Sequence, residues 1–300
     1  MKKFNTQHPF LQRLSQFLIL TLLIAIAGCS SIRLTYNHGD TLLYWWLNAY
    51  VDLDSEQKIL VKQDIDELFQ WHRNTQLRDY SQLLMKAQNQ LQSNKVTQAD
   101  LLADYGEVKS RTQSLLLKAV PELADLALSL KPEQINQMEK KFASNNDDFR
   151  KKNMRGDAAK QQKYRYEKSM DQFELWFGGF SDEQEDIIHK ASDARPLDNS
   201  IWLDERMRRQ NNILTLARKV QQEKPSKEAA MALIRTVIQE DFDRMNQPDR
   251  KAFFDAYTTS TAQLVLTVIK IATPRQKEHA MKRMQGWIDD LNGLAAEAKR

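Results

Sequence analysis

Residues with reactive side chains are few in this 300-residue sequence, and they are not spaced as in known catalytic motifs. The histidines after residue 30 are His38, His72, His189 and His279. No two of them lie four residues apart, and the H-E-x-x-H pattern of zinc hydrolases is absent. The sequence also lacks a G-x-S-x-G nucleophile motif and a glycine-rich phosphate loop. We therefore expect a protein that is not an enzyme and that uses no metal ion or cofactor.

Aromatic and basic side chains gather around Trp71-His72-Arg73, in the most unusual segment of the chain. One interpretation is a binding cleft in which His72 and Arg73 meet an anionic group. The alternative is that both side chains are half-buried and hydrogen-bonded to the first helix, with aromatic rings packed around them. The candidate cleft residues are Tyr36, Trp45, Asp52, Trp71, His72, Arg73 and Tyr80.

A basic segment follows between residues 140 and 168, with ten Lys and Arg against four Asp and Glu. Such a patch could bind anionic lipid head groups, lipopolysaccharide phosphates or an acidic partner. A merely solvated helix face is the alternative. The candidate patch residues are Lys151, Lys152, Arg155, Lys160, Lys163 and Arg165.

The first 28 residues have the pattern of a secretory signal peptide. Lys2, Lys3 and Arg13 form a basic start, and residues 17–27 are apolar apart from Thr21. Eleven residues are too few to cross a bilayer as a helix, which takes about twenty. Removal of residues 1–28 would leave 41 basic residues against 40 acidic ones, so we expect no nucleic-acid partner.

The segment Ile26-Ala27-Gly28-Cys29 resembles the lipobox of bacterial lipoproteins. The resemblance implies that Cys29 is acylated and becomes the first residue of the mature chain, so that its acyl chains hold the protein on a membrane. Ser30 follows in place of Asp. In Gram-negative lipoproteins this pattern implies the outer membrane, with the body of the protein in the periplasm.

Helical periodicity dominates the sequence from residue 41 onward, and no segment alternates convincingly at period two. We predict an all-α, elongated multi-helix bundle of roughly eight to ten helices and no sheet. Residues 54–93 contain neither Pro nor Gly, so they form one long helix or a helix with a bend near residues 71–76. The predicted organisation is a signal peptide (1–28), a lipidated start with a short tether (29–39), and a helical domain (40–300), as one lobe or as two that meet near residue 156.

Four pentapeptides share one design, in which a glutamine follows the expected helix cap by three residues. This is the arrangement of a capping box, which satisfies free backbone N–H groups at a helix start. It resembles the Leu-Thr-x-x-Gln pattern of a small family of periplasmic ATP-independent chaperones. The pentapeptides are Leu53–Gln57, Leu130–Gln134, Phe180–Gln184 and Ala272–Gln276.

The spacing from Tyr36-Asn37 through Trp45, Asp52 and Gln57 to Trp71-His72-Arg73 and Tyr80 resembles a family of uncharacterised proteobacterial lipoproteins with an all-helical domain of unknown function. The resemblance implies location and fold, and it brings no catalytic residues. We expect an outer-membrane-anchored periplasmic lipoprotein with a non-enzymatic interaction or envelope-maintenance role and a protein partner. The alternatives are an ATP-independent chaperone and an enzyme acting on cell-wall glycan, which would need a protonated Glu.

Overall fold

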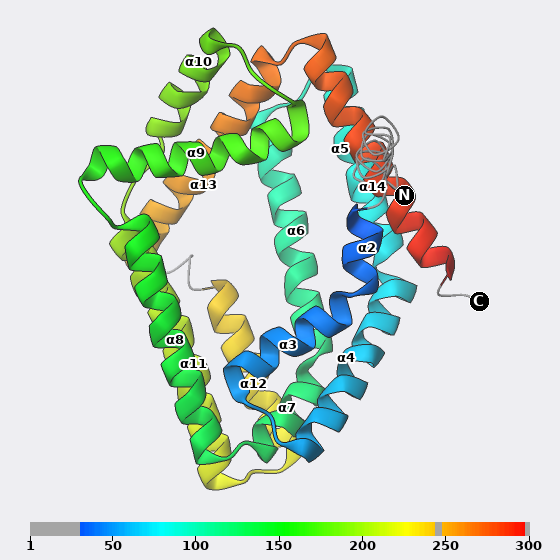
Figure 1. Ribbon diagram of the computed structural model, residues 1–300, viewed down its shortest axis with the longest axis vertical. Coiled ribbons are helices and arrows are strands. Elements are labelled where there is room, and N and C mark those ends of the chain that lie inside the picture. The colour runs from blue at the N-terminus through cyan, green and yellow to red at the C-terminus, as the bar shows by residue number, and fades with distance from the viewer. Residues whose placement is uncertain (1–30, 244–247, 298–300) are drawn as a thin grey trace, which may run out of the picture.

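A computed structural model describes residues 31–243 and 248–297, and these residues form an all-helical protein without a strand (Figure 1). The predicted fold class is confirmed in this respect. The helices, in chain order, are α2 (Ser31–Asn37), α3 (Gly39–Val51), α4 (Ser55–Thr75), α5 (Leu77–Ser93), α6 (Gln98–Lys118), α7 (Val120–Ser129), α8 (Pro132–Asn153), α9 (Ala158–Phe177), α10 (Asp182–Asp193), α11 (Asn199–Glu223), α12 (Lys227–Asp243), α13 (Pro248–Ile271) and α14 (Pro274–Glu297).

The predicted number of helices, eight to ten, is wrong, because the described residues contain thirteen. One additional helix is α2, which lies within the segment expected to be a tether. It is helical because Ile32 and Tyr36 pack against an apolar cluster of α5 and α14. Another arises because residues 54–93 form two helices. The break lies at Gln76, within the segment where a bend was expected.

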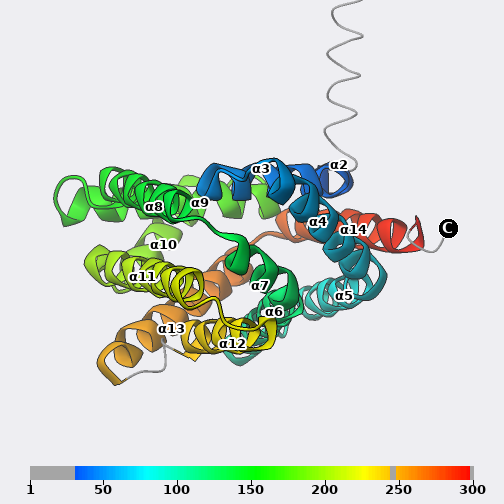
Figure 2. The ribbon, with the colours of Figure 1, turned by 90° about the horizontal axis from the view of Figure 1, so that it is seen from below.

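The helices outline a frame (Figure 1). Helices α4, α5 and α14 form one side, α8 and α11 form the other, and α6 crosses between the two ends. Seen from below, α2, α3, α8 and α9 lie along one face, and α12 and α13 lie along the opposite face (Figure 2). The packing agrees with this outline, since buried apolar side chains of the described helices fall into separate clusters rather than into one core.

Two of the predicted capping boxes meet at the lower end of the frame, where α4 and α8 begin. In each box the glutamine accepts a hydrogen bond from the cap N–H, that of Asp54 for Gln57 and that of Lys131 for Gln134. The side-chain amides of Gln57 and Gln134 also donate to each other's oxygen, at 3.1 and 2.6 Å. Both glutamines are buried. We call this pair the lower joint.

Each glutamine of the lower joint also reaches the chain that leads into the partner helix. The Gln57 amide donates to the carbonyl oxygen of Ser129, and the Gln134 amide donates to that of Asp52, at 3.0 and 3.1 Å. Both carbonyls lie two residues before a helix cap. The joint therefore ties two helix starts and their incoming loops together by reciprocal hydrogen bonds.

The other two boxes make the same contacts at the upper end of the frame, where α10 and α14 begin. The amides of Gln184 and Gln276 donate to each other's oxygen, at 2.9 and 3.1 Å. They also donate to the carbonyls of Ile271 and Gly179, which again lie two residues before a cap. We call this pair the upper joint. The four pentapeptides that share a glutamine in the sequence thus form two equivalent contacts, each between two helices that are distant in sequence.

Replacement of one glutamine of the lower joint should destabilise the fold. Gln57→Ala removes a cap contact and takes away one hydrogen-bond partner from the buried Gln134 amide and one from the Ser129 carbonyl, which costs about 1–3 kcal/mol. Gln63→Ala is the matched control, because Gln63 is exposed and bonds only to Glu67 of its own helix. Urea unfolding should show the loss for Gln57→Ala, and a change of at most about 0.5 kcal/mol for Gln63→Ala. Equal effects would contradict the role of the joint.

Candidate functional site

His72 is the centre of a half-buried hydrogen-bonded chain of side chains from α2, α4 and α5. Its Nδ1 lies 2.9 Å from the hydroxyl of Tyr36, and its Nε2 lies 3.3 Å from the hydroxyl of Tyr80. The ring also lies 5.8 Å from the Tyr36 ring and 5.2 Å from the Tyr80 ring, measured between centroids. Both nitrogens of His72 are thus engaged by tyrosines.

Arg73 and Trp71 border this chain on the outside. The guanidinium of Arg73 lies over the Tyr36 ring, 5.2 Å from its centroid, and donates to the side-chain oxygen of Asn37. The Trp71 ring is edge-on to His72 and has the ammonium group of Lys118 at 5.9 Å. The rings of Tyr36 and Trp71 therefore each have a cation over them, which is a favourable cation–π arrangement.

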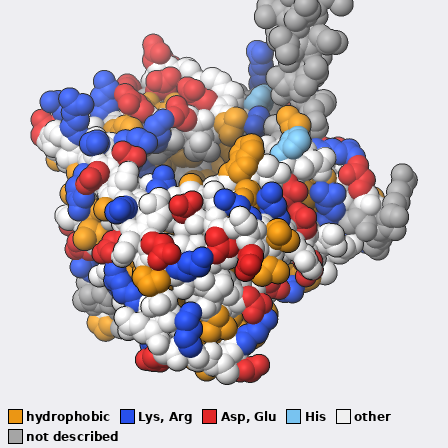
Figure 3. All heavy atoms as spheres, turned by 60° about the horizontal axis from the view of Figure 1, so that its bottom comes forward, with side chains coloured by type: hydrophobic (Ala, Val, Ile, Leu, Met, Phe, Trp, Pro, Cys, Tyr) orange, Lys and Arg blue, Asp and Glu red, His pale blue; other side chains and the backbone are white. Residues whose placement is uncertain are grey.

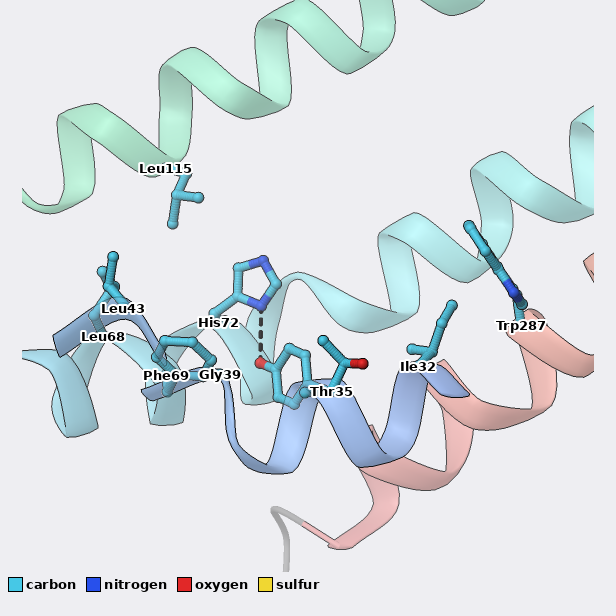
Figure 4. A pocket seen from close by; sticks show the side chains of 10 residues that line it. Ile32, Thr35, Gly39, Leu43, Leu68, Phe69, His72, Leu115 and Trp287 are labelled. Carbon is cyan, nitrogen blue, oxygen red and sulfur yellow. Dashed lines mark hydrogen bonds between the residues drawn. The ribbon is translucent and has the colours of Figure 1, made fainter. Parts of the chain in front are cut away.

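A pocket of about 540 Å³ opens beside His72 (Figure 4). It lies between α2, α3, α4, α6 and α14, and its wall is mostly apolar, with the imidazole of His72 among the lining side chains (Figure 4). The size and lining are those of a site for an apolar group. The lining residues are Ile32, Thr35, Tyr36, Gly39, Leu43, Leu68, Phe69, His72, Leu115 and Trp287.

Gly39 determines how closely α3 approaches α4 at the edge of this pocket. A Cβ atom at position 39 would lie 2.7 Å from the ring of Phe69, which is closer than carbon atoms pack. The absence of a side chain therefore allows the start of α3 to rest against the Phe69 ring, next to the break at His38 between α2 and α3.

Burial shifts the protonation equilibria of the hydrogen-bonded chain toward the neutral forms. It raises the pKa of Tyr36 to about 12, against the opposing charge of Arg73. It also raises the pKa of Tyr80 and lowers the pKa of His72. His72 is therefore neutral near pH 7, and it presents the pocket with an uncharged wall rather than with an anion-binding cation.

The structure brings together five of the seven residues predicted to line the cleft: Tyr36, Trp71, His72, Arg73 and Tyr80. The remaining two lie elsewhere. Trp45 is 62% exposed on the outer side of α3. Asp52 ends α3 in a left-handed conformation with φ 54°, and its carbonyl belongs to the lower joint.

The predicted basic patch lies at the corner between α8 and α9. Lys151, Lys152, Arg155, Lys160 and Lys163 are exposed there. Arg165 is half-buried, and its guanidinium donates to the carbonyls of Pro196, Ser192 and Arg195 at the end of α10. Arg165 thus holds the chain after α10 in place, and the exposed patch consists of the other five.

The pKa values of two partly or fully buried carboxyl groups, those of Glu205 and Asp64, are shifted in opposite directions. Burial acts to raise the pKa of Glu205, but hydrogen bonds from Arg208 and Arg209 outweigh it and lower the pKa. Burial raises the pKa of Asp64, and the nearby carboxylates of Glu122 and Asp125 add to the rise. Among the described residues, no three His, Cys, Asp or Glu side chains gather as a metal site would require.

Sequence reasoning missed the pocket residues that come from distant helices. Leu115 and Trp287 are contributed by α6 and α14, and both lie on the apolar stripes of their own helices. Their spacing indicates burial, but it carries no information on which helix they face.

The comparisons with known proteins place the chain in a family. Residues 49–236, more than half of the chain, match the model described as "Family of unknown function (DUF6279)". The chain belongs to DUF6279. The matched range includes Trp71, His72, Arg73 and Tyr80, and it begins after Tyr36 and Trp45. No curated protein and no solved structure matches this DUF6279 protein.

The stability of this DUF6279 protein should depend on pH through His72. Because its pKa is lowered in the fold, the unfolded chain binds more protons as pH falls through the ordinary value of 6.5. Acidification from pH 7.5 to 5.5 should therefore lower the free energy of unfolding of the wild type more than that of His72→Gln. The difference in the free energy of unfolding between the wild type and His72→Gln should therefore be smaller at pH 5.5 than at pH 7.5.

Urea unfolding at both pH values measures this difference. His38→Gln is the control, because it replaces an exposed imidazole that belongs to no part of the hydrogen-bonded chain around His72. A His72→Gln offset that stays constant would contradict a neutral, buried His72.

Proposed function

We propose that the protein is an outer-membrane-anchored lipoprotein that faces the periplasm and binds an apolar segment of another envelope protein. Its role is recognition or envelope maintenance rather than catalysis. The pocket beside His72 is the observation that carries the proposal. It has a mostly apolar lining, a neutral imidazole at its edge, and a volume of about 540 Å³.

The anchor is supported by the sequence before the described residues. The basic start, the apolar run and the Cys29 of the lipobox-like segment all precede residue 31, and they lie outside the described part of the chain. Helix α2 begins two residues after Cys29. Within residues 31–243 and 248–297, no helix has the length and apolar character needed to cross a membrane.

The pocket supports binding of a protein segment because five separate helices contribute to its wall. A wall of this kind fits one or a few apolar side chains. The resulting contact resembles the insertion of an apolar anchor into a groove, a common mode of peptide recognition.

A chaperone is the second candidate, and the exposed apolar side chains favour it. Ile59, Leu60 and Val108 are more than half exposed, and they lie on α4 and α6 rather than in one patch. Scattered apolar contacts suit many unfolded clients. A chaperone would suppress aggregation of unrelated proteins at near-equal stoichiometry, whereas a protein with one binding pocket would not.

Acylation of Cys29 predicts that Cys29→Ser releases the body from membranes. Several acyl chains give lasting attachment, whereas the serine variant has none. Fractionation should move the protein from the outer-membrane fraction to the soluble periplasmic fraction. Continued membrane attachment after signal cleavage, or an intact mass with a free thiol in the wild type, would contradict the anchor.

Binding at the pocket predicts position-specific crosslinking in intact cells. A photo-crosslinking amino acid in place of Leu115 faces the pocket, whereas one in place of Leu116 lies on the same helix but outside it. Mass spectrometry should identify one discrete partner at position 115 that is absent at position 116. The same set of proteins at both positions, or no adduct at position 115, would contradict the proposed function.

A further inference from the structure

Helix α3 is apolar on two opposite sides. Its inner side places Leu43, Leu47 and Tyr50 against the cluster shared with α4, α8 and α11. Its outer side carries a second apolar row at positions 42, 45, 46 and 49, the spacing of one helix face. Packing within the chain accounts for the first row. It covers the second row only in part, since the Trp46 ring contacts Tyr50 and Trp45 borders a shallow pocket beside α4.

The outer row, Leu42, Trp45, Trp46 and Ala49, is strongly exposed. Leu42 is 47% exposed, and the two tryptophans are 62% and 57% exposed. A tryptophan side chain can bury about 150–250 Å² of surface, so its exposure leaves a large apolar area in water. Tryptophan is also enriched where proteins meet the head-group region of a membrane, because the ring is apolar and its N–H is polar.

Helix α2, which lies along the same face as α3 (Figure 2), carries another exposed apolar side chain. Leu34 is 62% exposed there, only five residues after Cys29. Five extended residues span at most about 18 Å. If Cys29 carries acyl chains, Leu34 must therefore lie within that distance of the membrane surface. A tether of this length cannot hold α2 and α3 far from the lipid.

A cationic surface lies on the same face of the molecule. Seen from below, α8 and α9 lie along the same edge as α2 and α3 (Figure 2). Lys and Arg side chains lie at the surface there together with Asp and Glu side chains, and hydrophobic side chains show at the surface nearer to α3 (Figure 3). Among the described residues, Lys151, Lys152, Arg155 and Lys160 form no ion pair. They are free to meet external anions.

We propose that the face formed by the outer row of α3, Leu34 of α2 and the exposed cations of the α8–α9 corner docks on an anionic phospholipid surface. The inference rests on the acyl anchor proposed at Cys29, which keeps the face at the membrane. Trp45 and Trp46 insert at the boundary between head groups and acyl chains. The cations contact phosphate groups of the lipids. A protein partner would explain the apolar row, but not its position beside both the membrane-proximal end of the chain and a cationic corner.

A fluorophore placed on this face tests the proposal in the full-length acylated protein. The sequence contains a single cysteine, so an acylated Cys29 leaves only an introduced thiol to be labelled. Leu42→Cys places the probe in the outer row and keeps both tryptophans. Thr236→Cys places it on an exposed position of α12, on the opposite face (Figure 2). Both proteins are reconstituted in vesicles of phosphatidylethanolamine and phosphatidylglycerol that contain nitroxide-labelled lipid.

If this face docks on the membrane, the fluorophore at position 42 should show a blue-shifted emission and strong quenching by the nitroxide-labelled lipid. The fluorophore at position 236 should show neither effect. Lys151→Glu combined with Lys152→Glu should reduce the quenching at position 42, as should high salt. Equal quenching at the two positions, or none at position 42 while Cys29 carries its acyl chains, would overturn the docking. A second label on Cys29, detected by intact mass, would instead show that the anchor has failed, so the two failures are distinguishable.

Discussion

At each end of the frame, reciprocal hydrogen bonds between two glutamine side chains hold two helix starts together. A helix start leaves backbone N–H groups without partners inside the helix, and a glutamine of a capping box satisfies the N–H of the cap. Here the amide of the same glutamine also donates to the side-chain oxygen of the partner glutamine and to a carbonyl in the loop before the partner helix. Since a buried amide without partners is costly, these contacts fix which two helices begin together.

This constraint matters because the buried apolar side chains of the described residues are divided among separate clusters. Each of these clusters is shared by only a few helices. The lower joint positions the start of α4, and the upper joint positions the start of α14. His72 on α4 and Trp287 on α14 both line the pocket. The shape of the pocket thus depends on two contacts at opposite ends of the frame.

The helices and their starts could be predicted from the sequence because capping and periodicity are local. The pairing of the glutamines could not, because the partners are separated by 77 residues in the lower joint and by 92 in the upper. The number of helices was underestimated because α2 depends on contacts with α14, far along the chain. The separation of α4 from α5 at Gln76 could not be located to the residue, because the segment contains no Pro or Gly that would end a helix.

The candidate site divides in the same way. His72 and its tyrosines come together because Tyr36, His72 and Tyr80 each lie on the inner side of a helix. Trp45 is directed away from them and is exposed. The sequence did not reveal this, because α3 is apolar nearly all round and its pattern does not indicate which side faces inward. Arg165 was counted among exposed cations because three backbone carbonyls that bind it belong to a turn some thirty residues further along.

A double-mutant cycle on Gln57 and Gln134 tests the joint most directly. The free energy of unfolding is measured for the wild type, Gln57→Ala, Gln134→Ala and the double variant. If the two amides depend on each other as the geometry indicates, their coupling energy should be about 1–3 kcal/mol, with the double variant less destabilised than the sum of the single ones. Additive effects would show that the glutamines act only as separate caps, and would contradict the account.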